Sequence, residues 1–176
     1  MRSKQTTVIL GGSNGTKTLI SILGDKSNPV NDGHVIRVVS RSPQSFLDAK
    51  STPFNWTCNE QKAFSNLAPF EFLPKKWSTH VGRPDSVFGY NELGAALSGV
   101  GAPDEGGAAD VCLLCCPVHA HLKILREVAR TLYDLNAKGM LNSKKPLLIG
   151  TLYAAGGFDW MCRIAFSVER PVGFTR

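Results

Sequence analysis

The chain has 176 residues, of which 43% are hydrophobic and 9% aromatic, and it carries a formal net charge of +6. This composition excludes a disordered chain, and the length suits one domain, over residues 1–176, with a substantial core. No apolar run approaches the roughly 20 residues of a membrane-spanning helix, and the start, MRSKQTTVIL, lacks the apolar core of a signal peptide. We therefore expect a cytoplasmic protein without a membrane partner.

The net positive charge raises the question of nucleic-acid binding. The only adjacent basic pairs are Lys75-Lys76 and Lys144-Lys145, and no basic run is interleaved with aromatic residues. Clustered basic residues are the footprint of a nucleic-acid site, so their absence predicts a small anionic ligand instead.

The first third of the chain alternates apolar and amphipathic segments. Thr7–Leu10 predicts a buried strand, and Asn14–Leu23 has the apolar spacing of a helix. A second strand is expected at His34–Ser40. Ser42 followed by Pro43 is typical of a helix start, which predicts a short helix to about Lys50.

Residues 51–90 have no regular period, because four prolines interrupt them. Short strands are expected at Glu71–Leu73 and Ser86–Gly89. Asn91 is expected to cap a helix that ends at Leu97, and the following segment, GVGAPDEGG, reads as a surface loop.

A regular alternation then returns. Asp110–Pro117 is a continuous apolar run, as expected of a central parallel strand, and His121–Leu135 predicts a long amphipathic helix. Pro146–Tyr153 predicts a further buried strand, and the segment from Gly156 to Phe166 predicts a helix. The whole order predicts an α/β fold with a doubly wound, mainly parallel sheet.

A glycine-rich turn joins the first strand to the first helix, and it consists of Gly11, Gly12, Ser13, Asn14, Gly15 and Thr16. Gly11 would permit a tight turn, while Gly12 and Gly15 would leave the backbone accessible to a pyrophosphate at the helix N-terminus. The alternative is a sharp strand-to-helix connection without a ligand. A Walker-type loop is disfavoured, because Thr16 replaces the glycine that precedes the lysine.

The second strand ends in Ser40, Arg41 and Ser42, where an NAD site usually has a carboxylate that binds the ribose hydroxyls. Arginine and two hydroxyls suit a 2′-phosphate, so NADP is the expected cofactor and NAD the alternative. An ordinary exposed arginine beside a helix cap would give the same pattern, and Asp48 could restore an NAD-type contact.

Cysteines and histidines cluster around the central strand. Cys112 and Cys115 have the spacing of a redox or zinc pair, but alternation along a strand places them on opposite faces, so core packing without metal is expected. Five cysteines without a disulfide pattern fit a reduced compartment. His119 and His121 would either approach the cofactor or cap the next helix.

Three segments together resemble the opine (octopine/nopaline) dehydrogenase family. The turn resembles the family's G-G-x-N-G-A, with Thr16 for alanine, and Pro117-Val118-His119-Ala120-His121 resembles its P-x-x-A-H. Gly157-Phe158-Asp159-Trp160-Met161-Cys162-Arg163 is similar to a G-F-E-aromatic-x-C-R stretch, with aspartate for glutamate. The resemblance runs from about Thr7 to Arg163.

The resemblance implies a Rossmann-type NAD(P)-binding domain and an oxidoreductase that condenses an amino acid with a 2-keto acid. The helical domain that supplies the family's catalytic histidine is not expected in this chain. A stand-alone dinucleotide-binding module or sensor is the alternative. The predicted cofactor-binding residues are those of the glycine-rich turn, then Ser40, Arg41 and Ser42 at the end of the second strand, and Cys116, Pro117, Val118 and His121.

Overall fold

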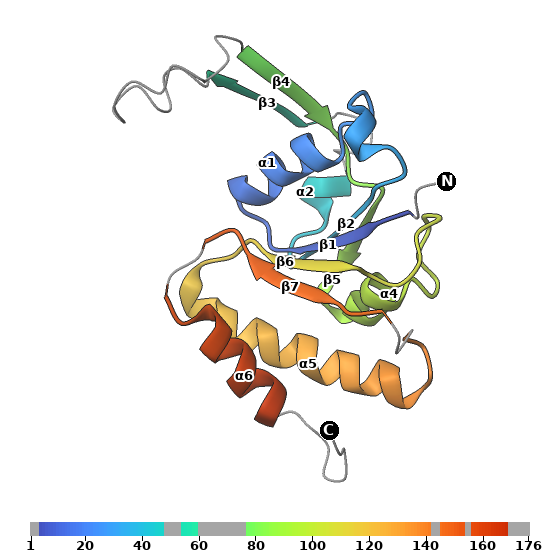
Figure 1. Ribbon diagram of the computed structural model, residues 1–176, viewed down its shortest axis with the longest axis vertical. Coiled ribbons are helices and arrows are strands. Elements are labelled where there is room, and N and C mark those ends of the chain that lie inside the picture. Colours follow the sequence, from blue (N-terminus) through green and yellow to red (C-terminus); the bar gives the residue numbers. More distant parts are fainter. Residues whose placement is uncertain (1–3, 48–53, 60–76, 142–144, 154–155, 169–176) are drawn as a thin grey trace.

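The computed structural model describes residues 4–47, 54–59, 77–141, 145–153 and 156–168 (Figure 1). Its centre is a five-stranded sheet in the order β5-β2-β1-β6-β7, and all four neighbouring pairs are parallel. The strands are β1 (Thr6–Leu10), β2 (Val35–Ser40), β5 (Ser86–Gly89), β6 (Val111–Leu114) and β7 (Leu148–Thr151). This is the strand order of a doubly wound Rossmann-type sheet, so the predicted fold class is confirmed.

Helices cover both faces of the sheet. One face carries α1 (Asn14–Leu23) and α2 (Gln44–Leu47), and the other carries α4 (Leu93–Ser98), α5 (His121–Ala137) and α6 (Phe158–Val168) (Figure 1). Single 3₁₀ turns occupy Pro29–Asn31, Tyr90–Glu92 and Val118–Ala120. No helix in the described ranges has both the length and the apolar character that crossing a membrane requires.

Alternation along the central strands builds two separate core clusters. In β1, Val8 and Leu10 belong to the cluster beneath α4, α5 and α6, while Ile9 belongs to the cluster beneath α1 and α2. Cys112 lies in the first cluster and Cys115 in the second, and both side chains are fully buried. The prediction that these two cysteines lie on opposite faces and fill the core is confirmed.

Most predicted elements of the main sheet and its helices are confirmed within one to three residues at their ends. The prediction that Asn91 caps the helix was wrong, because Asn91 lies inside a 3₁₀ turn. At the start of this turn the Gly89 N–H donates to the Glu92 carboxylate at 2.8 Å. The reason is that the chain enters α4 through this turn rather than directly from the strand. The strand expected at Glu71–Leu73 lies outside the described residues, as does the end of the helix that starts near Ser42.

A second, antiparallel sheet was not predicted. It pairs β3 (Phe54–Asn59) with β4 (Trp77–Gly82), and it packs against α1 on one side of the main sheet (Figure 1). The sequence FNWTCN does alternate apolar and polar residues, as expected of a strand. The partner strand is distant in the sequence, so no local turn signal marks the pairing.

Arg37 is a fully buried charge in the middle of β2. Its guanidinium donates two hydrogen bonds to the Asp104 carboxylate, at 2.7 and 2.9 Å, and three more to the carbonyls of Ala96, Gly106 and Gly107. All five N–H groups are thereby used. The segment expected to be only a surface loop is therefore anchored in the core through Asp104.

Candidate nucleotide site

A cavity of about 490 Å³ opens at the carboxyl edge of the main sheet, where β1, β2 and β6 end. The chain winds from β1 to β2 in one direction and returns to β6 on the other side of β1. Ligands of open α/β sheets bind at such a switch in strand order. The lining residues are Gly11, Gly12, Ser40, Arg41, Ser42, Ser45, Tyr90, Cys116, Pro117, His119, Ala120, Lys123 and Ile124.

The first two glycines of the turn form one wall of the cavity. Gly11 has φ of +142°, and a Cβ there would lie 2.3 Å from the Cys115 carbonyl oxygen, so only glycine fits between β1 and β6. Gly12 is exposed, and its Cβ would lie 3.2 Å from the Ser40 hydroxyl. Gly12 therefore keeps the backbone bare on the cavity side.

Ser13 precedes α1 but does not cap it. Its hydroxyl donates instead to the Cys115 carbonyl at 2.9 Å, which ties the turn to the end of β6. The first turn of α1 contains no acidic residue. Its N–H groups thus keep the partial positive charge of a helix N-terminus, which favours an anionic ligand.

The remaining turn residues do not line the cavity. A Cβ on Gly15 would lie 2.6 Å from the side-chain ends of both Leu152 and Tyr153, so this glycine packs against the segment that follows β7. Thr16 is fully buried, next to the Cys115 thiol. Asn14 is exposed outside the lining residues. The predicted cofactor roles of these residues stay predictions.

Ser40, the last residue of β2, and the next two residues, Arg41 and Ser42, all line the cavity, as expected. Ser40 is almost fully buried, and its hydroxyl accepts a hydrogen bond from the Ser42 N–H at 3.2 Å. Arg41 is exposed, and no described residue forms a hydrogen bond or ion pair with its guanidinium. No carboxylate is found among the described lining residues, and none of them pairs with the charge of Arg41.

The end of β6 supplies Cys116 and Pro117 to the cavity, whereas His121 lies behind it. The His121 ring is fully buried, its Nε2 lies 3.0 Å from the Cys116 carbonyl oxygen, and it packs edge-on against Phe158 at 5.7 Å. Direct cofactor contact by His121 therefore has no support in this arrangement, and the ring instead holds the end of β6. Val118 is outside the lining residues.

His121 and Phe158 come from two of the three family-like segments, which are far apart in the sequence. Their contact joins the start of α5 to the start of α6. These segments thus meet beneath the cavity wall, and their side chains support its shape.

Six lining residues were not among the predicted site residues: Ser45, Tyr90, His119, Ala120, Lys123 and Ile124. Four of them belong to the 3₁₀ turn and the helix that follow β6. The sequence could have indicated these four residues, because they directly follow a central strand. The helix after such a strand starts beside the switch in strand order, where ligands bind. Tyr90 arrives from the separate turn after β5.

The cysteine thiols near the cavity stay protonated at neutral pH. Burial raises the pKa of Cys115 to about 12, and the neighbouring Thr16 hydroxyl opposes part of that rise. Burial also raises the pKa of Cys116, and the nearby Arg41 charge opposes that rise. A thiol is a poor nucleophile and a poor metal ligand, so these cysteines suit packing.

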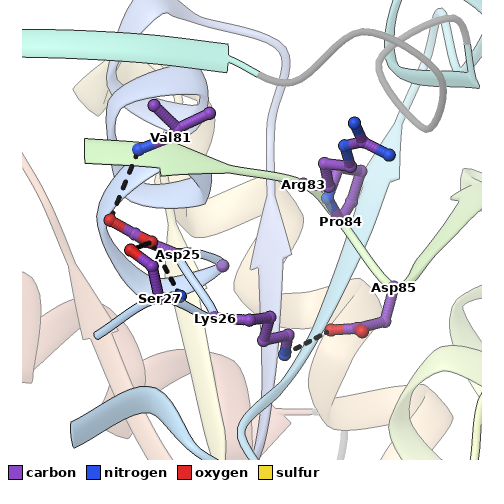
Figure 2. Close-up of a pocket in the computed structure, with 8 residues that line it drawn as sticks. Asp25, Lys26, Ser27, Val81, Arg83, Pro84 and Asp85 are labelled. Atoms are coloured by element: carbon purple, nitrogen blue, oxygen red, sulfur yellow. Dashed lines mark hydrogen bonds and ion pairs between the residues drawn. The ribbon is translucent and has the colours of Figure 1, made fainter. Parts of the chain in front are cut away.

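A second cavity, of about 640 Å³, lies where α1 ends and β4 leads into β5 (Figure 2). Its charged groups are largely paired with neighbours: Lys26 contacts Asp85 at 3.3 Å, and Asp25 accepts hydrogen bonds from the Ser27 N–H and from Val81. This cavity is at the opposite edge of the sheet from the glycine turn. It offers no free charge comparable to Arg41.

No protein-family model and no curated protein matches this chain. Among solved structures, glycerol-3-phosphate dehydrogenase from Coxiella burnetii is similar, with 14% sequence identity and a TM-score of 0.44. The alignment covers 93% of this chain and 38% of that chain, so the chain spans well under half the length of that enzyme. The assignment of the fold rests on the strand order and pairing described above.

Proposed function

We propose that this chain binds a nicotinamide dinucleotide, with NADP preferred, in the cavity at the carboxyl edge of the sheet. The observation that carries the proposal is the meeting of Gly11, Gly12 and the segment Ser40–Ser42 around one cavity at the switch point. A pyrophosphate suits the bare backbone and the uncapped start of α1. A 2′-phosphate suits the unpaired Arg41 guanidinium beside two hydroxyls.

We further propose that the chain is the nucleotide-binding part of an opine-type oxidoreductase, on the basis of the three family-like segments. When bound, the cofactor would supply a hydride to an imine formed from an amino acid and a 2-keto acid. The residues of this chain would hold the dinucleotide and exclude water from its phosphates. The described cavity contains no carboxylate that could act as a general base.

The binding proposal is tested by calorimetry with NADPH on the unmodified chain and on Gly12→Val. The valine side chain would fill the bare wall, so NADPH affinity should fall by at least about tenfold. Gly107→Val is the matched control, because a Cβ at Gly107 meets nothing within 4 Å. Unchanged affinity in a folded Gly12→Val protein would place the site elsewhere.

A turnover assay tests whether the chain by itself catalyses an opine-type reaction. NADPH, pyruvate and a set of amino acids are mixed with the chain, and NADPH absorbance is followed. Oxidation of NADPH that requires both substrates supports an opine-type reaction. Tight NADPH binding without turnover supports the binding proposal and is expected both of a stand-alone module and of the nucleotide-binding part of an enzyme whose catalytic residues lie in another domain.

A further inference from the structure

The proposed site has a second basic side chain, and it comes from a different element than Arg41. Lys123 lies in the first turn of α5 and lines the same cavity. Like Arg41, it is exposed, and no described residue forms a hydrogen bond or ion pair with it. By contrast, Lys26 in the second cavity is paired with Asp85.

None of the described residues that line the cavity is an aspartate or glutamate, so none of them compensates these two cations. Asp48, which was considered as an NAD-type ribose contact, lies outside the described residues. Tyr90 remains neutral, because burial raises its pKa to about 12. Two cations without a described partner line one cavity, one just past the end of β2 and the other in α5, and a doubly charged anion in that cavity would be attracted to both. An unphosphorylated ribose would leave both charges without a partner.

We infer that Lys123 and Arg41 hold the 2′-phosphate of NADP from two sides, which makes Lys123 a second determinant of cofactor preference. This inference rests on the proposed function. Arg41 can give the phosphate a planar, bidentate contact, and Lys123 adds a mobile point charge from the helix. Lys123 is therefore expected to contribute less than Arg41.

The test measures the affinities of NADPH and NADH, and of adenosine 2′,5′-bisphosphate and 5′-AMP as fragments without nicotinamide. Lys123→Gln should weaken NADPH and the bisphosphate by about three- to tenfold, and should change NADH and 5′-AMP by less than about twofold. Lys123→Arg should retain the preference, because it keeps the charge.

Lys138→Gln is the matched control, since it removes the same charge just past the end of the same helix. Its distance along α5 is about 22 Å, well beyond the screening length at physiological salt. Equal weakening of NADPH and NADH by Lys123→Gln, or no change in either, would overturn the inference and leave the binding proposal intact. Failure of the unmodified chain to bind either dinucleotide would overturn both.

Discussion

Arg37 and Arg41 are four residues apart in the chain, yet their side chains have opposite environments in the fold. Arg37 lies within β2, fully buried, with five hydrogen bonds that satisfy its whole guanidinium. Arg41 lies just past the end of the same strand, exposed, with no described partner. A buried charge must be paired within the protein, whereas a charge at the open edge can be reserved for a ligand.

The difference follows from the position of each residue along the strand. At Arg37, α4 and the loop that carries Asp104 close over the sheet and bring carbonyl groups to the guanidinium. At Arg41, the carboxyl edge of the sheet opens into the cavity. One arginine should therefore govern stability and the other should govern binding.

The largest expected effect is on stability, from Arg37→Met. The change removes the cation that pairs with the buried Asp104 carboxylate, which keeps only its hydrogen bonds from Ser86 and the Gly106 N–H, and it removes the donors to three carbonyls. The free energy of unfolding should therefore fall by about 3–5 kcal/mol. Urea denaturation measures this loss. The double variant Arg37→Met/Asp104→Leu should recover part of it, because no buried charge remains. A loss below about 1 kcal/mol in the single variant would contradict the buried pairing.

The next effect is on binding, from Arg41→Ala. NADPH affinity should fall by roughly ten- to a hundredfold, since a charge-assisted hydrogen bond contributes about 1.5–3 kcal/mol. NADH affinity and the free energy of unfolding should remain nearly unchanged. Dissociation constants for both cofactors provide the measurement. An NADH affinity equal to or tighter than that of NADPH in the unmodified protein would refute the NADP preference.

Acid should weaken the Arg37 cluster through Asp104. Burial raises the pKa of this carboxyl, but hydrogen bonds from Arg37, Ser86 and the Gly106 N–H outweigh that rise. Together they lower the pKa from an ordinary 3.8 to about 2. The folded state thus binds the Asp104 proton less readily than the unfolded chain. The associated stability, about 2 kcal/mol, is fully present above about pH 4 and is lost as the pH falls toward 2.

Urea titrations between about pH 6 and 2 check this prediction, with Asp104→Asn as the comparison. The unmodified protein should lose more stability than the variant over that range. Arg41→Ala should follow the unmodified curve, because Arg41 forms no described contact with Asp104. Parallel curves for the unmodified protein and Asp104→Asn would show that the carboxyl does not titrate differently on folding.

Salt should give the smallest effect, and it should act on the binding role of Arg41 but not on the stabilising role of Arg37. Raising the ionic strength to about 0.5 M screens exposed charges, so the NADPH preference over NADH should shrink by a few-fold. The stability difference between the unmodified protein and Arg37→Met should barely change, because water and ions do not reach the buried cluster. A preference that is independent of salt would point away from a phosphate contact with Arg41.

The sequence by itself determined the alternation of strands and helices, because side chains buried on both faces of a parallel sheet leave continuous apolar runs. It also located Gly11, Gly12 and the segment Ser40–Ser42, since adjacent positions in the chain form the turn and the strand end. These residues do line one cavity.

Only the tertiary structure decided which other residues join them and which are drawn away. Gly15 is covered by the segment that follows β7, and His121 is buried against Phe158, through contacts between distant segments. Lys123 and Tyr90 reach the cavity because α5 begins, and the turn after β5 lies, at the same edge of the sheet. Arg37 within β2 and Arg41 just past its end look alike in sequence, and only the elements packed over each decide whether its charge is paired within the core or is exposed at the edge of the sheet.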